Sequence, residues 1–124
     1  MTMTARFEIF SVDLDAAADF YRRVLGFDVA ADRRPADDPY VALLRGTVRI
    51  GAARRGSGRP EWRRPPTGGE IVLEVDDVDA EREHVVGQGW PLDADLVDRP
   101  WGLRDFRVLD PDGYYLRITS RPGS

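Results

Sequence analysis

Residues 100–119 of this 124-residue chain read PWGLRDFRVLDPDGYYLRIT, and this stretch decides the fold. The segment Asp110-Pro111-Asp112-Gly113 has turn chemistry, because proline presets the backbone at the second position of a turn and glycine accepts the positive φ that closes it. On both sides of the turn, apolar and aromatic residues alternate with charged ones, which is typical of strands. The stretch therefore predicts a β-hairpin with one dry face and one wet or ligand-facing face.

Alternation along the second strand of this hairpin assigns its side chains to two faces. One face carries Tyr114, Leu116 and Ile118, and the other carries Tyr115, Arg117 and Thr119. The second set is polar and aromatic, so it suits a binding surface better than a core. Tyr115 and, on the preceding strand, Phe106 are predicted either to line a cavity or to pack in the core.

A β-α-β-β-β pattern occurs twice along the chain. Residues 6–12 alternate before Asp13-Leu14-Asp15, and residues 70–75 alternate before Asp77-Val78-Asp79. An aspartate at that place predicts a capped helix N-terminus, and a following glycine predicts the helix end. The first helix is expected at about 16–24 and the second to end near 87–89, with further strands at 27–30, 40–44, 47–52 and, weakly, within 91–98. Such a repeat fixes the fold.

We therefore expect an α+β fold of two βαβββ modules with curved mixed sheets, forming one domain over residues 1–124. Module one covers 5–53, an Arg-, Gly- and Pro-rich linker covers 54–69, and module two covers 70–120. An exposed apolar sheet face is costly, so the modules are expected to curl into a cup around a cavity. Its inner face would carry Arg6, Glu8 and Phe10 from one copy and Glu70, Val72 and Glu74 from the other.

Composition excludes several classes of function. The net charge of −4 argues against nucleic-acid binding. The chain has no cysteine and all 18 of its basic residues are arginine, so thiolate chemistry and a lysine Schiff base are excluded. No apolar run approaches a membrane span and no signal-peptide core is present, so we expect no membrane partner and a cytoplasmic location.

Three segments resemble the vicinal oxygen chelate superfamily, the group of glyoxalase, extradiol dioxygenase and bleomycin-resistance proteins. These segments are residues 12–27, 75–79 and 109–113. The resemblance covers nearly the whole chain and implies paired βαβββ modules, usually assembled as a dimer with two cavities. In the family's enzymes it also implies a divalent metal, held by His or Glu on the first strand and Glu on the last strand of each module.

The metal positions implied by the resemblance fall on Arg6 and Glu70 for the first strands and on Gly51, within a residue or so, and Arg117 for the last strands. An arginine has no lone pair to donate and a glycine has no side chain, so three of these four cannot ligate. The single histidine, His84, is predicted to be a solvated helix residue away from the cup. We therefore expect no metal and no cofactor.

Trp101-Gly102 resembles the Trp-Gly segment of bleomycin-resistance proteins, where metal is also absent and a cationic aromatic drug lies in a groove shared by two chains. The resemblance implies metal-independent binding of a hydrophobic or aromatic small molecule by a homodimer, with antibiotic sequestration as its use. The predicted ligand-binding residues are Arg6, Glu8, Phe10, Glu70, Glu74, Trp101, Phe106, Tyr115 and Arg117.

Structural roles remain open for the same residues. Trp101 could pack over the hairpin edge, and Trp62 could be a loop residue rather than a lid on a cavity. Arg6, Glu70 and Arg117 could form a charge network that only holds the modules in register, since burying such a network adds little stability.

Two enzymatic functions also remain open. One is a lyase or dioxygenase of the glyoxalase type, with a metal held by Glu8, Glu70 and Glu74. The other is a metal-free lyase in which Glu70 or Glu74 transfers a proton while Arg117 holds a substrate carboxylate. The sequence leaves open whether the protein is an enzyme at all.

Overall fold

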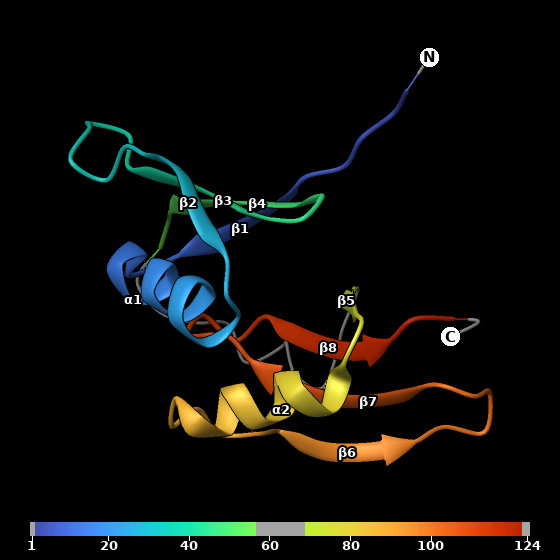
Figure 1. The fold of residues 1–124 in the computed structure, drawn as a ribbon. Helices are drawn as coiled ribbons and strands as arrows, with labels where there is room; N and C mark the ends of the chain where they lie inside the picture. Colours follow the sequence, from blue (N-terminus) through green and yellow to red (C-terminus); the bar gives the residue numbers. More distant parts are fainter. Residues whose placement is uncertain (1, 57–68, 123–124) are drawn as a thin grey trace. The chain divides into compact units, whose positions relative to one another are not determined.

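The structure is a computed structural model that describes residues 2–56 and 69–122, and it divides at residue 59 into two compact units. Each unit contains a four-stranded mixed sheet with a helical segment after its first strand (Figure 1). The predicted α+β fold with two β-α-β-β-β copies is confirmed. The cup between the copies stays a prediction.

Unit 1 has the strand order β1-β4-β3-β2, in which β1 runs parallel to β4 and the other neighbours are antiparallel. Its elements are β1 (Phe7–Ser11), α1 (Leu14–Asp19), η1 (Phe20–Val24), β2 (Asp28–Asp32), β3 (Tyr40–Arg45) and β4 (Val48–Arg54). The strand β4 extends two residues beyond the predicted hairpin, into the start of the predicted linker. The rest of that linker, including Trp62, lies outside the described residues.

Unit 2 repeats this topology with the order β5-β8-β7-β6 and a parallel pair β5–β8. Its elements are β5 (Ile71–Val75), α2 (Val78–Gly87), β6 (Ala94–Asp98), β7 (Arg104–Leu109) and β8 (Tyr115–Ser120). Residues 100–103, predicted as strand, instead form the turn between β6 and β7 because Gly102 adopts a φ of +90° there.

Matching aspartates begin the helical segments of both units. The carboxylate of Asp13 accepts a hydrogen bond from the backbone N–H of Ala16 at 3.1 Å, and that of Asp77 accepts one from Ala80 at 3.0 Å. Each cap satisfies a backbone donor that the first helical turn leaves without a partner. The first helix therefore begins at Leu14, two residues before the predicted start.

The first helix also ends differently from a plain α-helix. Its last turn, η1, is a π-helical turn in which the N–H of Leu25 donates to the carbonyl of Phe20 at 3.2 Å. Gly26 then adopts a φ of +73°, which ends the helix as predicted. Phe20 and Tyr21 are fully buried in this turn, with ring centroids 5.0 Å apart in an edge-to-face arrangement.

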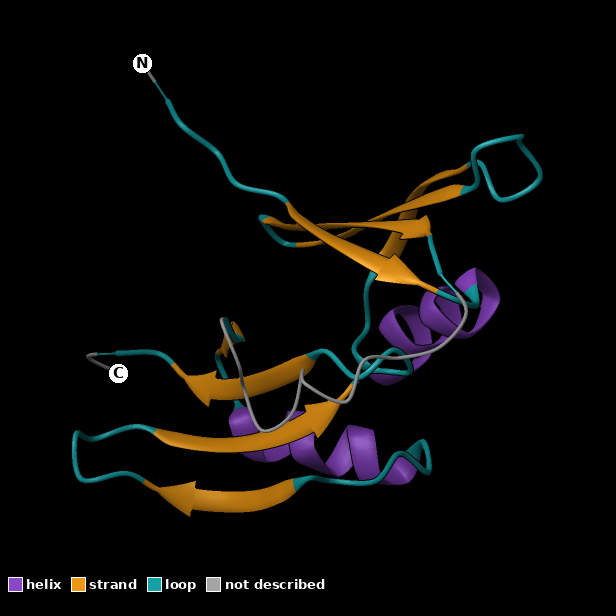
Figure 2. Ribbon diagram, turned by 180° about the vertical axis from the view of Figure 1, so that it is seen from behind, coloured by secondary structure: helices purple, strands orange, loops and turns teal. Residues whose placement is uncertain are grey.

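One face of the second sheet packs on α2 (Figure 2). Its largest fully buried side chains come from alternate positions of β7 and β8 and from the helix itself. They are Val85, Phe106, Val108, Leu116 and Ile118. Because neighbouring residues of a strand point to opposite faces, the residues between these core positions lie on the other face of the sheet.

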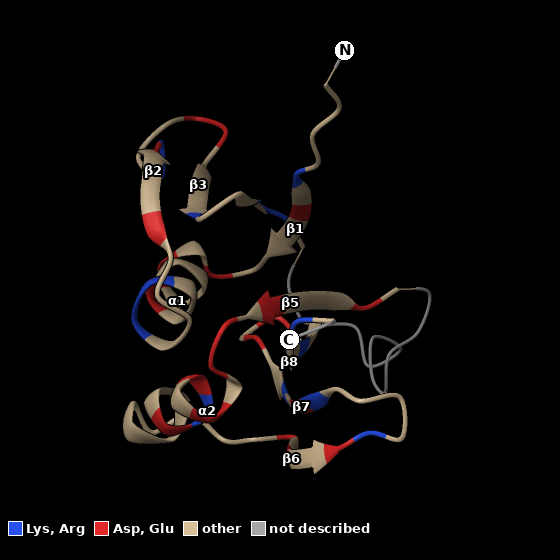
Figure 3. Cartoon of the chain, turned by 45° about the vertical axis from the view of Figure 1, so that its right-hand side comes forward, with Lys and Arg blue, Asp and Glu red and all other residues tan. Residues whose placement is uncertain are grey.

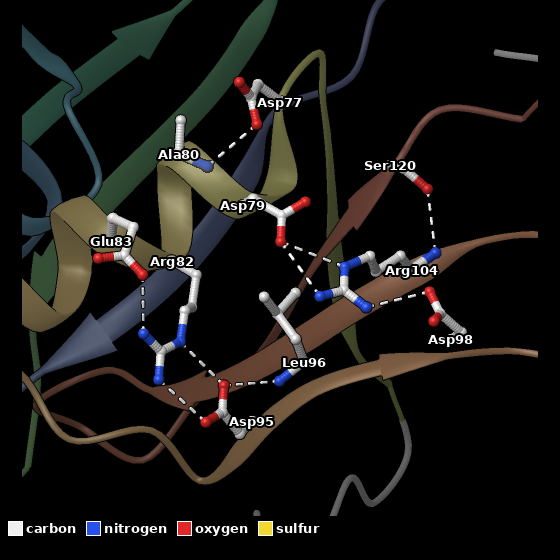
Figure 4. A network of polar contacts seen from close by, with 10 residues as sticks. All are labelled: Asp77, Asp79, Ala80, Arg82, Glu83, Asp95, Leu96, Asp98, Arg104 and Ser120. Carbon is white, nitrogen blue, oxygen red and sulfur yellow. Dashed lines mark hydrogen bonds and ion pairs between the residues drawn. The ribbon is translucent and has the colours of Figure 1, made fainter.

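Ion pairs on the helix side fasten α2 to its sheet (Figure 4). Arg82 on α2 donates to both carboxylate oxygens of Asp95 on β6, at 2.9 and 3.0 Å. Arg104 on β7 lies 3.1 Å from Asp79 on α2 and 3.1 Å from Asp98 on β6. These carboxylates are mostly exposed, so solvent screening keeps the contribution of each pair to stability small. None of the helices among the described residues is long and apolar enough to cross a lipid bilayer.

Candidate ligand-binding face of the second sheet

The turn between β7 and β8 sets the register of the candidate site. The Asp110 carboxylate accepts hydrogen bonds from the backbone N–H groups of Asp112 and Tyr114, both at 2.9 Å. Gly113 has a φ of +85°, and its N–H donates to the carbonyl of Asp110 at 3.0 Å. This turn, predicted from the sequence, places Arg107 directly opposite Arg117.

We call the sheet face turned away from α2 the arginine face, and two rows of residues across the strands define it. Arg104, at an even position of β7, bonds to α2, so odd positions of β7 lie on the arginine face. The first row is Val72, Arg117, Arg107 and Ala94. The second row is Glu74, Thr119, Asp105 and Val97. Figure 3 shows basic residues on β7 of this sheet.

Glu70 lies between the two arginines of the first row. Its carboxylate oxygens are 3.4 Å from an Nη of Arg117 and 3.7 Å from the Nε of Arg107. The three side chains are largely buried, with exposures of 18% for Glu70, 24% for Arg107 and 26% for Arg117. Of the three residues expected to lie close together, Glu70 and Arg117 do so, and Arg107 joins them, whereas the place of Arg6 beside them stays a prediction.

Tyr115 borders this cluster. It is buried, its hydroxyl donates to Asp93 at 3.0 Å, and the Arg107 guanidinium lies 5.6 Å from its ring centroid. Burial, followed by the hydrogen bond to Asp93, raises the pKa of Tyr115 above its ordinary value of 10.0. The phenol therefore stays neutral at physiological pH and acts as a hydrogen-bond donor.

Arg99 forms the second charged contact of the arginine face. It donates to both oxygens of Asp105, each at 3.0 Å, while Asp105 is only 2% exposed. Asp105 lies at an odd position of β7, so its carboxylate is on the arginine face and turns towards Arg99. The same Arg99 guanidinium lies 5.9 Å from the ring centroid of Trp101, which is 61% exposed at the β6–β7 turn.

Unit 1 has a different arrangement at the matching positions. Gly51 on β4 lies beside Glu8 on β1 and Ala42 on β3. The Tyr40 hydroxyl donates to Glu8 at 3.0 Å, and the Nε of Arg6 lies 2.6 Å from the same carboxylate. A Cβ added to Gly51 would lie 1.8 Å from the Tyr40 hydroxyl and 2.6 Å from Glu8, so only glycine leaves room for this contact.

The remaining predicted site residues are scattered. Phe106 is fully buried and pairs with Ile118 on the α2 side, so of its two predicted places it takes the one in the core. Phe10 is 44% exposed with the Arg55 guanidinium 5.9 Å from its ring, and Glu74 is exposed.

His84 is exposed on α2, as expected of a solvated helix residue.

Sequence reasoning missed Arg107, Arg99 and Tyr40. The signal for Arg107 was present: counting outward from a turn at residues 110–113 pairs position 107 with 117, and cross-strand partners share a face. No comparable signal identified Arg99, because its contact depends on the chain bending back at the β6–β7 turn.

The residues at the implied metal positions do not fit a metal ion. Arg117 and Gly51 supply no ligand atom, and the one suitable residue, Glu70, faces two guanidinium groups. Within residues 2–56 and 69–122, no three His, Asp or Glu side chains lie close enough together to hold a metal ion.

The model of the Glyoxalase/Bleomycin resistance protein/Dioxygenase superfamily matches residues 4–118. No curated protein matches the chain.

Among solved structures, TioX from Micromonospora sp. ML1 is similar, with 27% identity, a TM-score of 0.77, and coverage of 96% of this chain and 98% of that chain. A lactoylglutathione lyase from Agrobacterium tumefaciens has 20% identity, a TM-score of 0.71, and coverage of 96% and 92%. A superfamily member from Sphaerobacter thermophilus DSM 20745 has 24% identity, a TM-score of 0.72, and coverage of 98% of both chains. The chain belongs to the glyoxalase/bleomycin resistance protein/dioxygenase superfamily.

Proposed function

We propose that the protein binds an apolar or aromatic small molecule without using a metal, and that antibiotic sequestration is the use of this binding. The observation that carries the proposal is the arginine pair of the second sheet. Arg117 stands at a position implied to hold a metal-binding glutamate, and Arg117 and Arg107 both flank Glu70. A site built this way is suited to holding a ligand by charge and contact rather than by coordination.

Apolar and aromatic side chains support an apolar ligand. Val72 and Val97, in the two rows of the arginine face, are 38% and 43% exposed, and Trp101 is 61% exposed. An exposed indole offers a flat surface for a planar ligand, and one stacked pair contributes about 1 kcal/mol. Phe10, 44% exposed in unit 1, is a further proposed contact.

A titration with a panel of aromatic antibiotics, followed by tryptophan fluorescence, tests the proposal. We expect saturable binding by the wild-type protein and weaker binding by Trp101→Ala. Trp90→Phe is the matched control, because the Trp90 indole donates to the backbone carbonyl of Leu109 at 2.9 Å and is part of the packing. Absence of saturable binding across the panel would overturn the proposal, and unchanged affinity in Trp101→Ala would remove Trp101 from the site.

Metal analysis of protein purified without chelators separates this proposal from a glyoxalase-type metalloenzyme. That alternative needs Glu8, Glu70 and Glu74 as ligands, whereas Glu8 is held by Arg6 and Tyr40 and Glu70 by two arginines. We expect no stoichiometric divalent metal. One bound ion per chain that is lost in Glu70→Gln would reverse the ranking.

We also propose that the binding form is a homodimer, as is usual for members of the family. Sedimentation of the purified protein tests this directly. A monomer that still binds the ligand with full affinity would contradict it.

A further inference from the structure

Arg107 and Arg117 form a pair of neighbouring cations on one sheet face. They are directly opposite each other on antiparallel strands, so both side chains leave the sheet on the same side. Like charges at such a position are unfavourable unless a negative group lies between them. Glu70 supplies one negative charge for the two positive ones.

The contacts of Glu70 with these arginines are long. Separations of 3.4 and 3.7 Å exceed those of a good hydrogen bond between a guanidinium and a carboxylate. Among the described residues, the Nε atoms of Arg107 and Arg117 and one oxygen of Glu70 are buried and have no hydrogen-bond partner. Polar groups left this way are costly, so the cluster favours an added acceptor.

The neighbouring charges do not supply that acceptor. Asp105 is engaged by Arg99 through two hydrogen bonds of 3.0 Å, and Asp93 accepts from Tyr115. Glu74 lies in the next row and is exposed to solvent. Among the described residues, the Nε atoms of Arg107 and Arg117 therefore stay without an acceptor, and both side chains are still about a quarter exposed.

We propose that Arg107 and Arg117 bind the carboxylate of an aromatic acid on the arginine face. A planar guanidinium presents paired N–H donors that match the two oxygens of a carboxylate. The two Nε–H donors without an acceptor suit a carboxylate, and the exposed Val72 in the same row gives the ligand's ring an apolar contact. This inference rests on the proposed function and names the chemical class of its ligand.

Benzoate and its neutral analogue benzamide provide the test, with two NMR readouts on the full chain. The side-chain Nε–Hε resonances of Arg107 and Arg117 report the carboxylate, and the Trp101 indole resonance reports the aromatic ring. We expect benzoate to shift both arginine resonances and benzamide, at the same concentration, to leave them in place. Benzoate should bind roughly tenfold more tightly than benzamide, as expected for one charge-assisted hydrogen bond.

Three variants sharpen this test. Arg117→Met should weaken benzoate binding roughly tenfold and leave benzamide unaffected. Glu70→Gln should strengthen benzoate binding, because it removes the carboxylate that competes for the same donors. Arg104→Met is the matched control: it changes the net charge equally, but Arg104 lies on the α2 side of the same strand, so benzoate binding should not change. A dispersed spectrum shows that each variant is folded.

The outcomes separate this inference from the proposed function. If both compounds shift the Trp101 indole and neither shifts the arginines, the carboxylate site is wrong and aromatic binding stands. If benzoate binds Arg117→Met and Arg104→Met as well as it binds the wild type, the carboxylate site is also wrong. If benzoate and benzamide shift none of these resonances, and the antibiotic panel also fails to bind, both proposals fall.

Discussion

The two units share one scaffold and differ in what lies across one face of the sheet. Each has a parallel edge pair, an aspartate-capped helix and a glycine that ends it. The central row of unit 1 holds Glu8, Gly51 and Ala42, whereas that of unit 2 holds Val72, Arg117 and Arg107. The two units therefore share a backbone arrangement and differ in the side chains that this row of the sheet carries.

The polar groups of this row have close hydrogen-bond partners in unit 1 and only long contacts in unit 2. In unit 1 the glycine lets the Tyr40 hydroxyl reach Glu8, whose carboxylate also pairs with Arg6 within hydrogen-bond distance. In unit 2 the arginines stand at long contacts from Glu70, and among the described residues their buried Nε atoms have no hydrogen-bond partner. The first arrangement can be purely structural, and the second calls for a ligand.

The largest effect should come from the core side of the second sheet. Phe106→Ala should lower the free energy of unfolding by about 3–5 kcal/mol, because it removes a fully buried ring. Val72→Ala, on the arginine face, should cost less than about 1 kcal/mol because Val72 is 38% exposed. Urea denaturation measures both values. If the two variants were equally stable, the assignment of the two faces would be wrong.

The arginine face can be separated from the α2 side by two matched substitutions. Arg99→Met should cost about 2–3 kcal/mol, since it leaves the buried Asp105 carboxylate without its charged partner. Arg104→Met should cost clearly less, since its partners Asp79 and Asp98 are 61% and 79% exposed and solvent screens both pairs. Denaturant midpoints of the two variants check this order, and a larger loss in Arg104→Met would contradict it.

The hydrogen bond between Tyr40 and Glu8 in unit 1 depends on Gly51, which has no side chain. Gly51→Ala should destabilise the protein by about 1–3 kcal/mol, because the new Cβ must displace Tyr40 and Glu8. Gly87→Ala is the control: nothing lies within 4 Å of its added Cβ, and alanine favours a helix, so stability should rise slightly. The double variant Gly51→Ala, Tyr40→Ala should recover part of the loss. Additive losses would show that Tyr40 and Gly51 are not coupled.

Local sequence signals predicted the scaffold because each rests on nearby residues. Asp13 and Asp77 bond to backbone groups three positions away, and Gly113 closes a four-residue turn. The π-helical turn at Phe20–Val24 was missed, since its bonds depend on how the buried rings of Phe20 and Tyr21 pack rather than on any single residue type.

The candidate site could be predicted only in part. Alternation placed Glu70 and Arg117 on one face, and Tyr115 with them, but it also suggested Phe106 as a ligand contact. Phe106 is one of the even-numbered residues of β7, which lie on the face of the sheet that packs on α2. Contacts between segments far apart in the chain, such as Tyr40 with Glu8, depend on strand order and register, which no local pattern contains.

Where the units agree, equal substitutions should have equal effects. Asp13→Ala and Asp77→Ala should each cost about 1 kcal/mol, because each removes one helix cap. Asp13→Asn and Asp77→Asn should retain most of the stability, since asparagine caps as well as aspartate. Circular dichroism during urea unfolding gives these values. A loss confined to one unit would show that the two helix starts are not equivalent.

The smallest effect on stability should come from an exposed arginine–aspartate ion pair, of which each unit has one. Hydrogen bonds from Arg34 lower the pKa of Asp32 to about 2, and those from Arg82 and Leu96 lower that of Asp95 to about 2, from an ordinary 3.8. The unfolded chain therefore binds these protons at higher pH than the folded one, so the stabilisation is complete above pH about 4 and is lost as the pH falls towards 2. Asp32→Asn and Asp95→Asn should each be slightly less stable than the wild type at neutral pH. Unfolding followed against pH should show both differences vanish in acid; a difference that persisted there would mean that the lost contact is not the ionised pair.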